Sequence, residues 1–141
     1  MNQLNEPRCE LELKLLDAQE GRITSEALLE ALLDSQVYMP VQEEKAAELS
    51  IQRSARAQPL VLPDENGRLI LILFSSPERS REFVQEFPGY GGGRLTEFVW
   101  ILERMGRDYG IALNPGQDIG FDMEPETVNQ LIDALANRPT H

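Results

Sequence analysis

One segment limits the possible folds of this chain more than any other: the six residues Leu69–Phe74 are all apolar. A strand without a polar position must be buried on both faces, so it belongs at the centre of a covered sheet. The segment Asp64–Gly67 before it is a hairpin turn, and Leu60–Leu62 supplies the strand that pairs with it. The sequence therefore predicts an α/β (α+β) fold with this strand at its centre.

Hydrophobic residues at helical spacing predict helices around that strand, at about residues 9–16, 24–35, 77–87, 95–105 and 125–136. Further short strands are expected at 37–39, 111–113 and 118–123. We expect a single compact domain over residues 1–141, with a small mixed β-sheet of about five strands flanked by about five helices. The polar residues 42–58 are expected to form a loop or a short helix, and residues 137–141 are expected to form a tail.

The charge balance argues against two classes of partner. The chain carries 24 acidic and 13 basic residues, a formal net charge of −11. Nucleic acid and anionic membranes are bound through concentrated basic surfaces, which this sequence lacks. The longest strongly apolar run is too short to cross a bilayer, and the N-terminal segment lacks the apolar core of a signal peptide. We therefore expect a cytoplasmic protein that binds neither nucleic acid nor membrane.

Nucleophilic and metal chemistry lack their usual residues in this chain. His141 is the only histidine and the last residue, where an imidazole is hard to hold in place. Cys9 is the only cysteine, and the glutamates around it disfavour the reactive thiolate. We expect no catalytic residue, no metal site and no cofactor.

Polar, aromatic and proline residues follow several of the predicted strands. In an open α/β sheet, ligands collect at the strand ends, and aromatic side chains there give a partner apolar anchors. We interpret these strand ends as a groove for a peptide or a partner protein, lined by Tyr38, Pro40, Phe74, Ser75, Asn114, Pro115 and Gly116. One alternative stays open, because the Asn114 side chain can also bond to the backbone of its own turn.

A glycine-rich segment before a predicted helix offers backbone amides to an anion. This candidate anion site consists of Gly91, Gly92, Gly93 and Arg94. A flexible connection is the simpler interpretation, because the Gly-Lys-Ser/Thr ending of a phosphate-binding loop is missing. Four acids gather near the last helix without the spacing of a calcium loop, and we interpret them as residues that stabilise its start: Asp118, Asp122, Glu124 and Glu126.

Several segments in order resemble one known family. They are Leu11-Glu12, Leu28–Pro40, Asn66–Arg68, Leu73–Arg79, Gly110–Gly116 and Pro125–Leu131. Over about residues 11–135 the chain is similar to the N-terminal domain of the SseB family, the enhanced-serine-sensitivity proteins of bacteria. The resemblance implies a compact α/β domain with a mixed sheet, whose biochemical role is poorly defined. Many relatives carry a second, C-terminal domain.

These observations favour a non-enzymatic protein-interaction, regulatory or adaptor domain of a bacterial cytoplasmic protein. Two alternatives stay open. The first is a small-molecule or anion sensor that uses the glycine segment and the strand ends. The second is a hydrolase that relies on carboxylates alone. The sequence also leaves open whether the chain pairs with itself.

Overall fold

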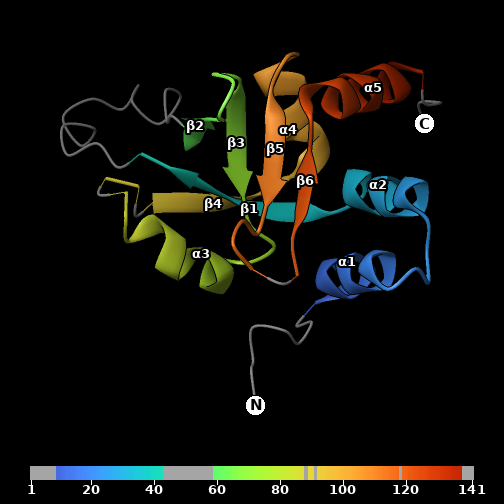
Figure 1. The fold of residues 1–141 in the computed structure, drawn as a ribbon, viewed down its shortest axis with the longest axis horizontal. Coiled ribbons are helices and arrows are strands. Elements are labelled where there is room, and N and C mark those ends of the chain that lie inside the picture. The colour runs from blue at the N-terminus through green and yellow to red at the C-terminus, as the bar shows by residue number, and fades with distance from the viewer. Residues whose placement is uncertain (1–8, 43–58, 88, 91, 118, 138–141) are drawn as a thin grey trace.

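The computed structural model describes residues 9–42, 59–87, 89–90, 92–117 and 119–137. Five helices and six strands follow one another in this part of the chain (Figure 1). In order they are α1 (Glu10–Gln19), α2 (Ser25–Leu33), β1 (Gln36–Val41), β2 (Val61–Pro63), β3 (Leu69–Leu73), α3 (Pro77–Val84), β4 (Gly92–Glu97), α4 (Phe98–Met105), β5 (Gly110–Leu113), β6 (Phe121–Met123) and α5 (Pro125–Ala136). The predicted loop or helix at 42–58 and the predicted tail at 137–141 lie outside the described residues, apart from Gln42 and Asn137.

A four-stranded mixed sheet in the order β2-β3-β5-β6 forms the centre of the domain. β3 and β5 run parallel, and the two outer strands pair with them antiparallel. β3 is a central strand, as its apolar run predicts, with Leu71, Ile72 and Leu73 all buried. The mixed α+β fold expected from the sequence is confirmed.

The Asp64 side chain stabilises the turn between β2 and β3 through hydrogen bonds to the backbone. Its Oδ1 atom accepts hydrogen bonds from the backbone N–H groups of Asn66, at 2.8 Å, and Arg68, at 2.9 Å. These bonds, the one from Arg68 foremost, hold the pKa of the Asp64 carboxyl below its ordinary value. Gly67 takes a φ of 82°, which favours glycine because side chains crowd the backbone there. The predicted hairpin turn is therefore confirmed.

The two remaining strands, β1 and β4, form a separate antiparallel sheet. Tyr38 of β1 connects the two sheets through Phe74, the residue after β3. The Tyr38 amide donates to the Phe74 carbonyl at 2.6 Å, and the Phe74 amide donates to the Tyr38 carbonyl at 2.9 Å. The strands are thus divided between two linked sheets instead of one.

The helix predicted at 95–105 is wrong at its start. Residues 92–97 form strand β4, and the helix begins only at Phe98. β4 pairs along its length with β1, with Leu95 opposite Tyr38, and Leu95 is 56% exposed. The hydrophobic spacing of residues 95–105 is typical of a helix that begins at Leu95, but pairing with the distant strand β1 decides the conformation of this residue.

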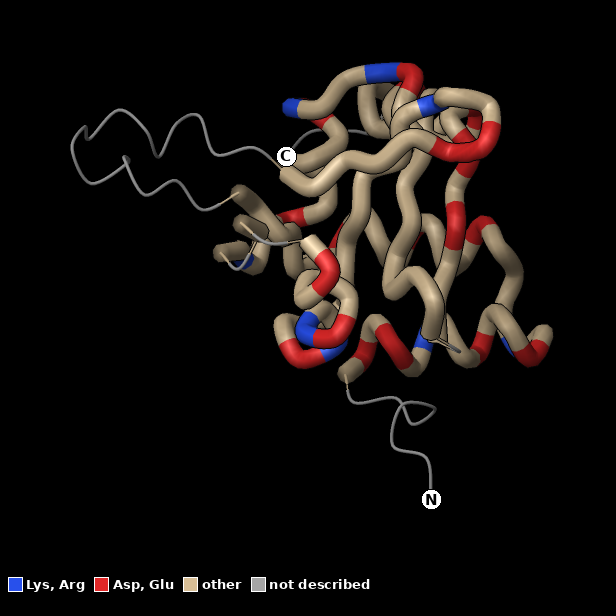
Figure 2. Tube along the Cα trace, turned by 60° about the vertical axis from the view of Figure 1, so that its left-hand side comes forward, with Lys and Arg blue, Asp and Glu red and all other residues tan. Residues whose placement is uncertain are grey.

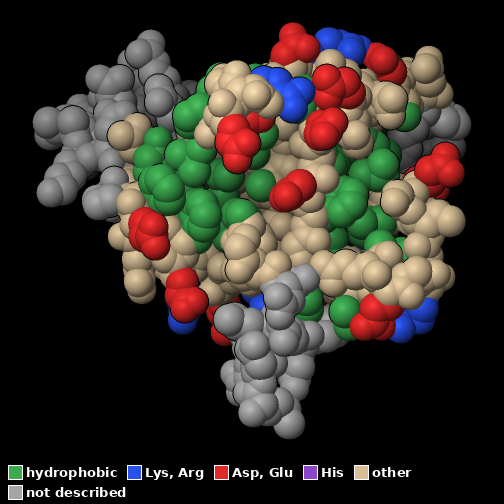
Figure 3. Space-filling model, viewed as in Figure 1, with side chains coloured by type: hydrophobic (Ala, Val, Ile, Leu, Met, Phe, Trp, Pro, Cys, Tyr) green, Lys and Arg blue, Asp and Glu red, His purple; other side chains and the backbone are tan. Residues whose placement is uncertain are grey.

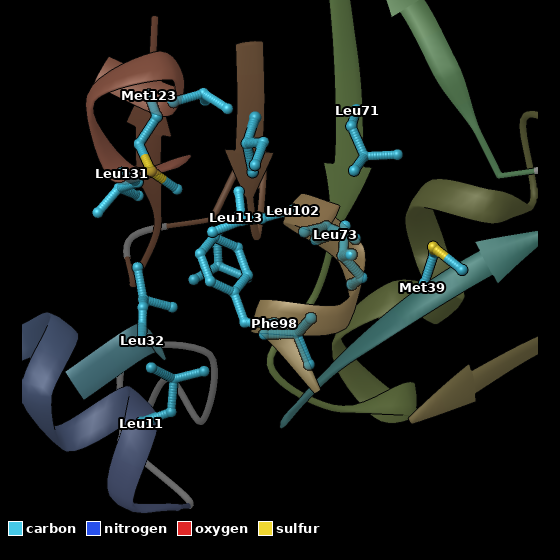
Figure 4. Close-up of a cluster of buried hydrophobic side chains, with 14 of the residues drawn as sticks. Leu11, Leu32, Met39, Leu71, Leu73, Phe98, Leu102, Leu113, Met123 and Leu131 are labelled. Atoms are coloured by element: carbon cyan, nitrogen blue, oxygen red, sulfur yellow. The ribbon is translucent and has the colours of Figure 1, made fainter. Parts of the chain in front are cut away.

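Hydrophobic side chains from both sheets and from α1, α2, α4 and α5 meet in one main core. Figure 4 shows how this core joins residues far apart in the sequence, among them Leu11, Phe98 and Met123. The strands β3 and β5 contribute Leu71, Leu73, Ile111 and Leu113 from one face of the sheet. Side chains of the opposite face form a second, smaller cluster of Leu60, Ile72, Phe74 and Ala112.

Two side-chain caps start helices where the sequence predicts them. Thr24 accepts a hydrogen bond from the Ala27 amide at 3.1 Å at the start of α2. Ser76 accepts one from the Arg79 amide at 3.3 Å, and Pro77 opens α3. The chain therefore turns from β3 directly into α3, which places Arg79 near the end of the sheet.

Charged residues lie mainly on the helices and turns, and the central strands carry few of them (Figure 2). Among the described helices, none combines the length and the apolar character that a membrane crossing requires.

Candidate functional site

Polar side chains from four segments meet at the carboxyl ends of the parallel strands β3 and β5. We call this group the buried polar cluster. Its members are the buried residues Glu12, Ser75, Arg79 and Asn114 and the half-buried Gln117. Glu12 comes from α1 and Arg79 from α3, whereas Ser75 is the second residue after β3 and Asn114 the first after β5. Strand ends of this kind are the usual ligand sites of α/β proteins, so the contacts within the cluster decide whether a ligand has room.

An ion pair lies at the centre of the cluster. Arg79 Nη2 lies 2.7 Å from Glu12 Oε1, and Arg79 Nε lies 3.0 Å from Glu12 Oε2. The two side chains are 1% and 0% exposed. A bidentate pair of this geometry matches the fork of the guanidinium to both carboxylate oxygens and offsets much of the cost of burying two charges.

Ser75 and Asn114 link this ion pair to the strand ends. The Ser75 hydroxyl donates to Glu12 Oε2 and accepts a hydrogen bond from Asn114 Nδ2 at 2.9 Å. Asn114 Oδ1 accepts from the Ser75 amide at 3.0 Å, and Nδ2 also donates to the Ile119 carbonyl at 2.8 Å. Asn114 has a φ of 54°, a left-handed conformation that asparagine tolerates better than most residues.

The buried polar cluster is therefore satisfied by its own members. Gln117 completes it from the side, with its Nε2 atom donating to the Arg79 carbonyl at 2.7 Å. Buried polar groups bonded to one another hold segments together, because breaking any one bond leaves a group without a partner. These contacts tie α1 and α3 to the ends of the two parallel strands.

The seven residues expected to line a partner groove lie in different environments. Tyr38 and Pro115 are half-buried and Gly116 is exposed, whereas the other four are buried: Pro40, Phe74, Ser75 and Asn114. The structure brings Ser75 together with Asn114, and Tyr38 together with Phe74. The proposed groove therefore divides into the polar cluster inside the fold and an apolar area around Tyr38.

That apolar area covers the face of the four-stranded sheet opposite the main core. We call it the aromatic face, and it consists of the half-buried side chains Tyr38, Leu62, Ile70, Phe83, Phe87 and Tyr90. They pack over the buried residues of the second cluster, and Figure 3 shows hydrophobic side chains gathered over β2 and β3. The ring centroids of Phe74 and Phe83 lie 5.6 Å apart, and Phe83 stacks on Phe87 at 5.2 Å. The face is thus a continuous apolar surface that reaches solvent.

The glycine segment contributes to this face through packing. A Cβ atom on Gly93 would lie 2.2 Å from Tyr38 Oη, so the Tyr38 ring occupies the space that only glycine leaves free. Of the candidate anion site, Gly91 lies outside the described residues, and Gly92, Gly93 and Arg94 lie in β4 opposite β1. The helix begins four residues later, at Phe98, so these three residues do not form its N-terminus.

The candidate metal and nucleophile residues that the structure describes belong to several different elements. Among the described residues, no three His, Cys, Asp or Glu side chains are placed to hold a metal ion. Asp122 lies on β6, and Glu124 and Glu126 stand at the start of α5, where carboxylates stabilise the helix dipole. Cys9 is exposed, whereas Asp118 and His141 lie outside the described residues.

Sequence reasoning missed the buried ion pair and most of the aromatic face. Glu12 and Arg79 are 67 positions apart, and no local pattern marks them as partners. The spacing of four residues between Phe83 and Phe87 is typical of one side of a helix, but α3 ends at Val84 and Phe87 follows it. Such spacing does not say whether protein or solvent covers the side chains.

The comparisons with known proteins add a family and no further detail. The family described as SseB protein N-terminal domain matches residues 11–130, which span the buried polar cluster and the aromatic face. Neither the curated proteins nor the solved structures gave a match to the chain. The matched segment covers most of the 141 residues, and the chain belongs to the SseB family through this N-terminal domain.

Proposed function

We propose that this domain is a non-enzymatic protein-interaction module that captures a partner protein on the aromatic face. The observation that carries the proposal is the unequal covering of the central sheet. One face packs into the main core under α4 and α5. Over the other face lie six half-buried apolar side chains that reach solvent, two from the sheet itself and four from β1, α3 and the segment after α3. Contiguous apolar surface is costly to leave in water and is typical of binding sites.

The composition of the face supports a protein partner. Three of its residues are tyrosines or phenylalanines from α3 and the segment after it: Phe83, Phe87 and Tyr90. Aromatic side chains supply much of the binding energy in protein interfaces, because they bury large areas and lose few rotamers.

The charge around the face indicates what the partner carries. Exposed acids outnumber the exposed base Arg81 of α3 on the neighbouring segments. They are Glu65 in the hairpin turn, Glu82 and Glu86 on or beside α3, and Asp122 on β6. Figure 3 shows acidic side chains bordering the hydrophobic area. A complementary partner segment therefore presents apolar side chains flanked by Lys or Arg, since opposite charges at a rim steer association.

A peptide selection tests this proposal. The purified domain is used to select binders from a library of random peptides, with a fold-checked Ile70→Lys variant as the comparison. We expect enriched peptides that combine aromatic or aliphatic residues with Lys or Arg, and an affinity at least about tenfold lower for Ile70→Lys.

Leu69→Lys is the matched control. Leu69 is the preceding strand residue, is 44% exposed and projects from the opposite side of β3. Its substitution should leave the affinity within about twofold of the original. Peptides that bind all three proteins equally would refute the aromatic face as the docking surface.

A further inference from the structure

A second apolar groove lies between α2 and α5, away from the aromatic face. It has a volume of about 430 Å³ and opens to solvent between the two helices. α4 packs against both helices. Leu29, Leu33, Leu131 and Ala134 give the groove its apolar lining. Hydrophobic side chains also gather below α5 on the right of Figure 3.

The two charged side chains among the described residues that line this groove are both glutamates. α2 carries Glu26 and Glu30, α5 carries Glu126 and Asp133, and neither helix contains a Lys or Arg. Glu126 and Asp133 face Arg68 and Arg107 in ion pairs. Glu26 and Glu30 line the groove, and within the described part of the chain no basic side chain lies at ion-pair distance from either. Two exposed carboxylates at an apolar groove therefore favour a cationic occupant.

We propose that this groove binds an amphipathic helix of a partner protein, with apolar residues on one side and Lys or Arg on the edges. A helix fits a groove between helices because its own backbone groups are already bonded, whereas an extended peptide would find no strand edge to pair with. α2 has 9 residues and α5 has 12, so a helix of about two and a half to three and a half turns matches their lengths.

The same charges disfavour a second copy of this chain as the occupant. Two copies that met through this groove would bring Glu26 and Glu30 of both chains together in an apolar surrounding. Like charges held together in an interface cost several kcal/mol, so self-association of the chain through this groove is unfavourable.

A designed peptide tests the groove directly. The probe is a fluorescent peptide of about fourteen residues, with Leu at helical spacing and Lys elsewhere. Anisotropy titration should give saturable binding that weakens at least about tenfold for the Glu26→Lys/Glu30→Lys variant. The control variant is Glu103→Lys, a charge reversal at an exposed residue of α4 outside the groove, which should change the affinity less than about threefold.

Two further measurements separate this inference from its alternatives. A scrambled peptide of the same composition should bind more weakly, and equal binding would show charge attraction without a groove. Ile70→Lys on the aromatic face should leave the affinity unchanged, so failure of the proposed function and failure of this inference are distinguishable. The proposal would be overturned if binding did not saturate up to about 1 mM peptide, or if Glu103→Lys lowered the affinity as much as Glu26→Lys/Glu30→Lys does. It would also be overturned if the domain formed a dimer that Glu26→Lys/Glu30→Lys abolished.

Discussion

Replacing Glu12 by alanine leaves the Arg79 guanidinium buried without its carboxylate. Both side chains are at most 1% exposed, and they share two hydrogen bonds of 2.7 and 3.0 Å. Removing one partner of such a pair costs about 3–5 kcal/mol. A domain of this size is stable by about 5–15 kcal/mol, so the loss takes about a fifth or more of the total. The melting temperature should fall by roughly 10–15 °C.

A double-mutant cycle separates the pair from its surroundings. Urea unfolding followed by circular dichroism should place both Glu12→Ala and Arg79→Ala at lower midpoints with an unchanged slope. The double variant Glu12→Ala/Arg79→Ala completes the cycle, and its cost should be about 0.5–3 kcal/mol smaller than the sum of the two single costs. The stabilising role of the buried ion pair would be refuted if each single variant lost less than about 1 kcal/mol of unfolding free energy, or if the two losses simply added in the double variant.

Three further predictions concern the turns and the tyrosine. Asn114→Ala loses buried hydrogen bonds and places alanine at a φ of 54°, so urea unfolding should show a loss of about 2–4 kcal/mol in the free energy of unfolding. Asn114→Gly should lose about 1 kcal/mol less, because glycine adopts this φ freely. Gly93→Ala should displace the Tyr38 ring, visible as altered NMR shifts of that ring with the fold retained, and unchanged shifts would contradict the packing. The lowered pKa of Asp64 implies that its carboxylate contributes to the stability of the fold. This contribution is present above the ordinary aspartate pKa and is lost as the pH falls through the pKa of the folded state. The stability difference from Asp64→Asn should therefore be present at neutral pH and shrink below about pH 4, and a pH-independent difference would contradict it.

Local chemistry explains which parts of the fold could be predicted from sequence. The apolar run of β3, the turn at Asp64 and the caps at Thr24 and Ser76 each act within a few residues, and all lie where expected. The start of α4 could not be predicted this way. Leu95 has helical spacing to its neighbours, but its backbone pairs with β1, more than fifty positions away.

The candidate sites depend still more on distant contacts. The sequence marked Ser75 and Asn114 as strand-end residues, which is where they lie, but it did not reveal that Glu12 fills the space between them and Arg79. The aromatic face was partly visible through Tyr38. Its other members read as ordinary core residues, because hydrophobic spacing does not distinguish a buried face from one that awaits a partner.

An NMR titration of the labelled domain with an enriched peptide from the selection maps the contact directly. We expect shift changes concentrated on β2, β3, α3 and the Tyr90 segment, and their disappearance in Ile70→Lys but not in Leu69→Lys. Changes centred on β4 and α4, around the exposed Leu95 and Trp100, would contradict docking on the aromatic face.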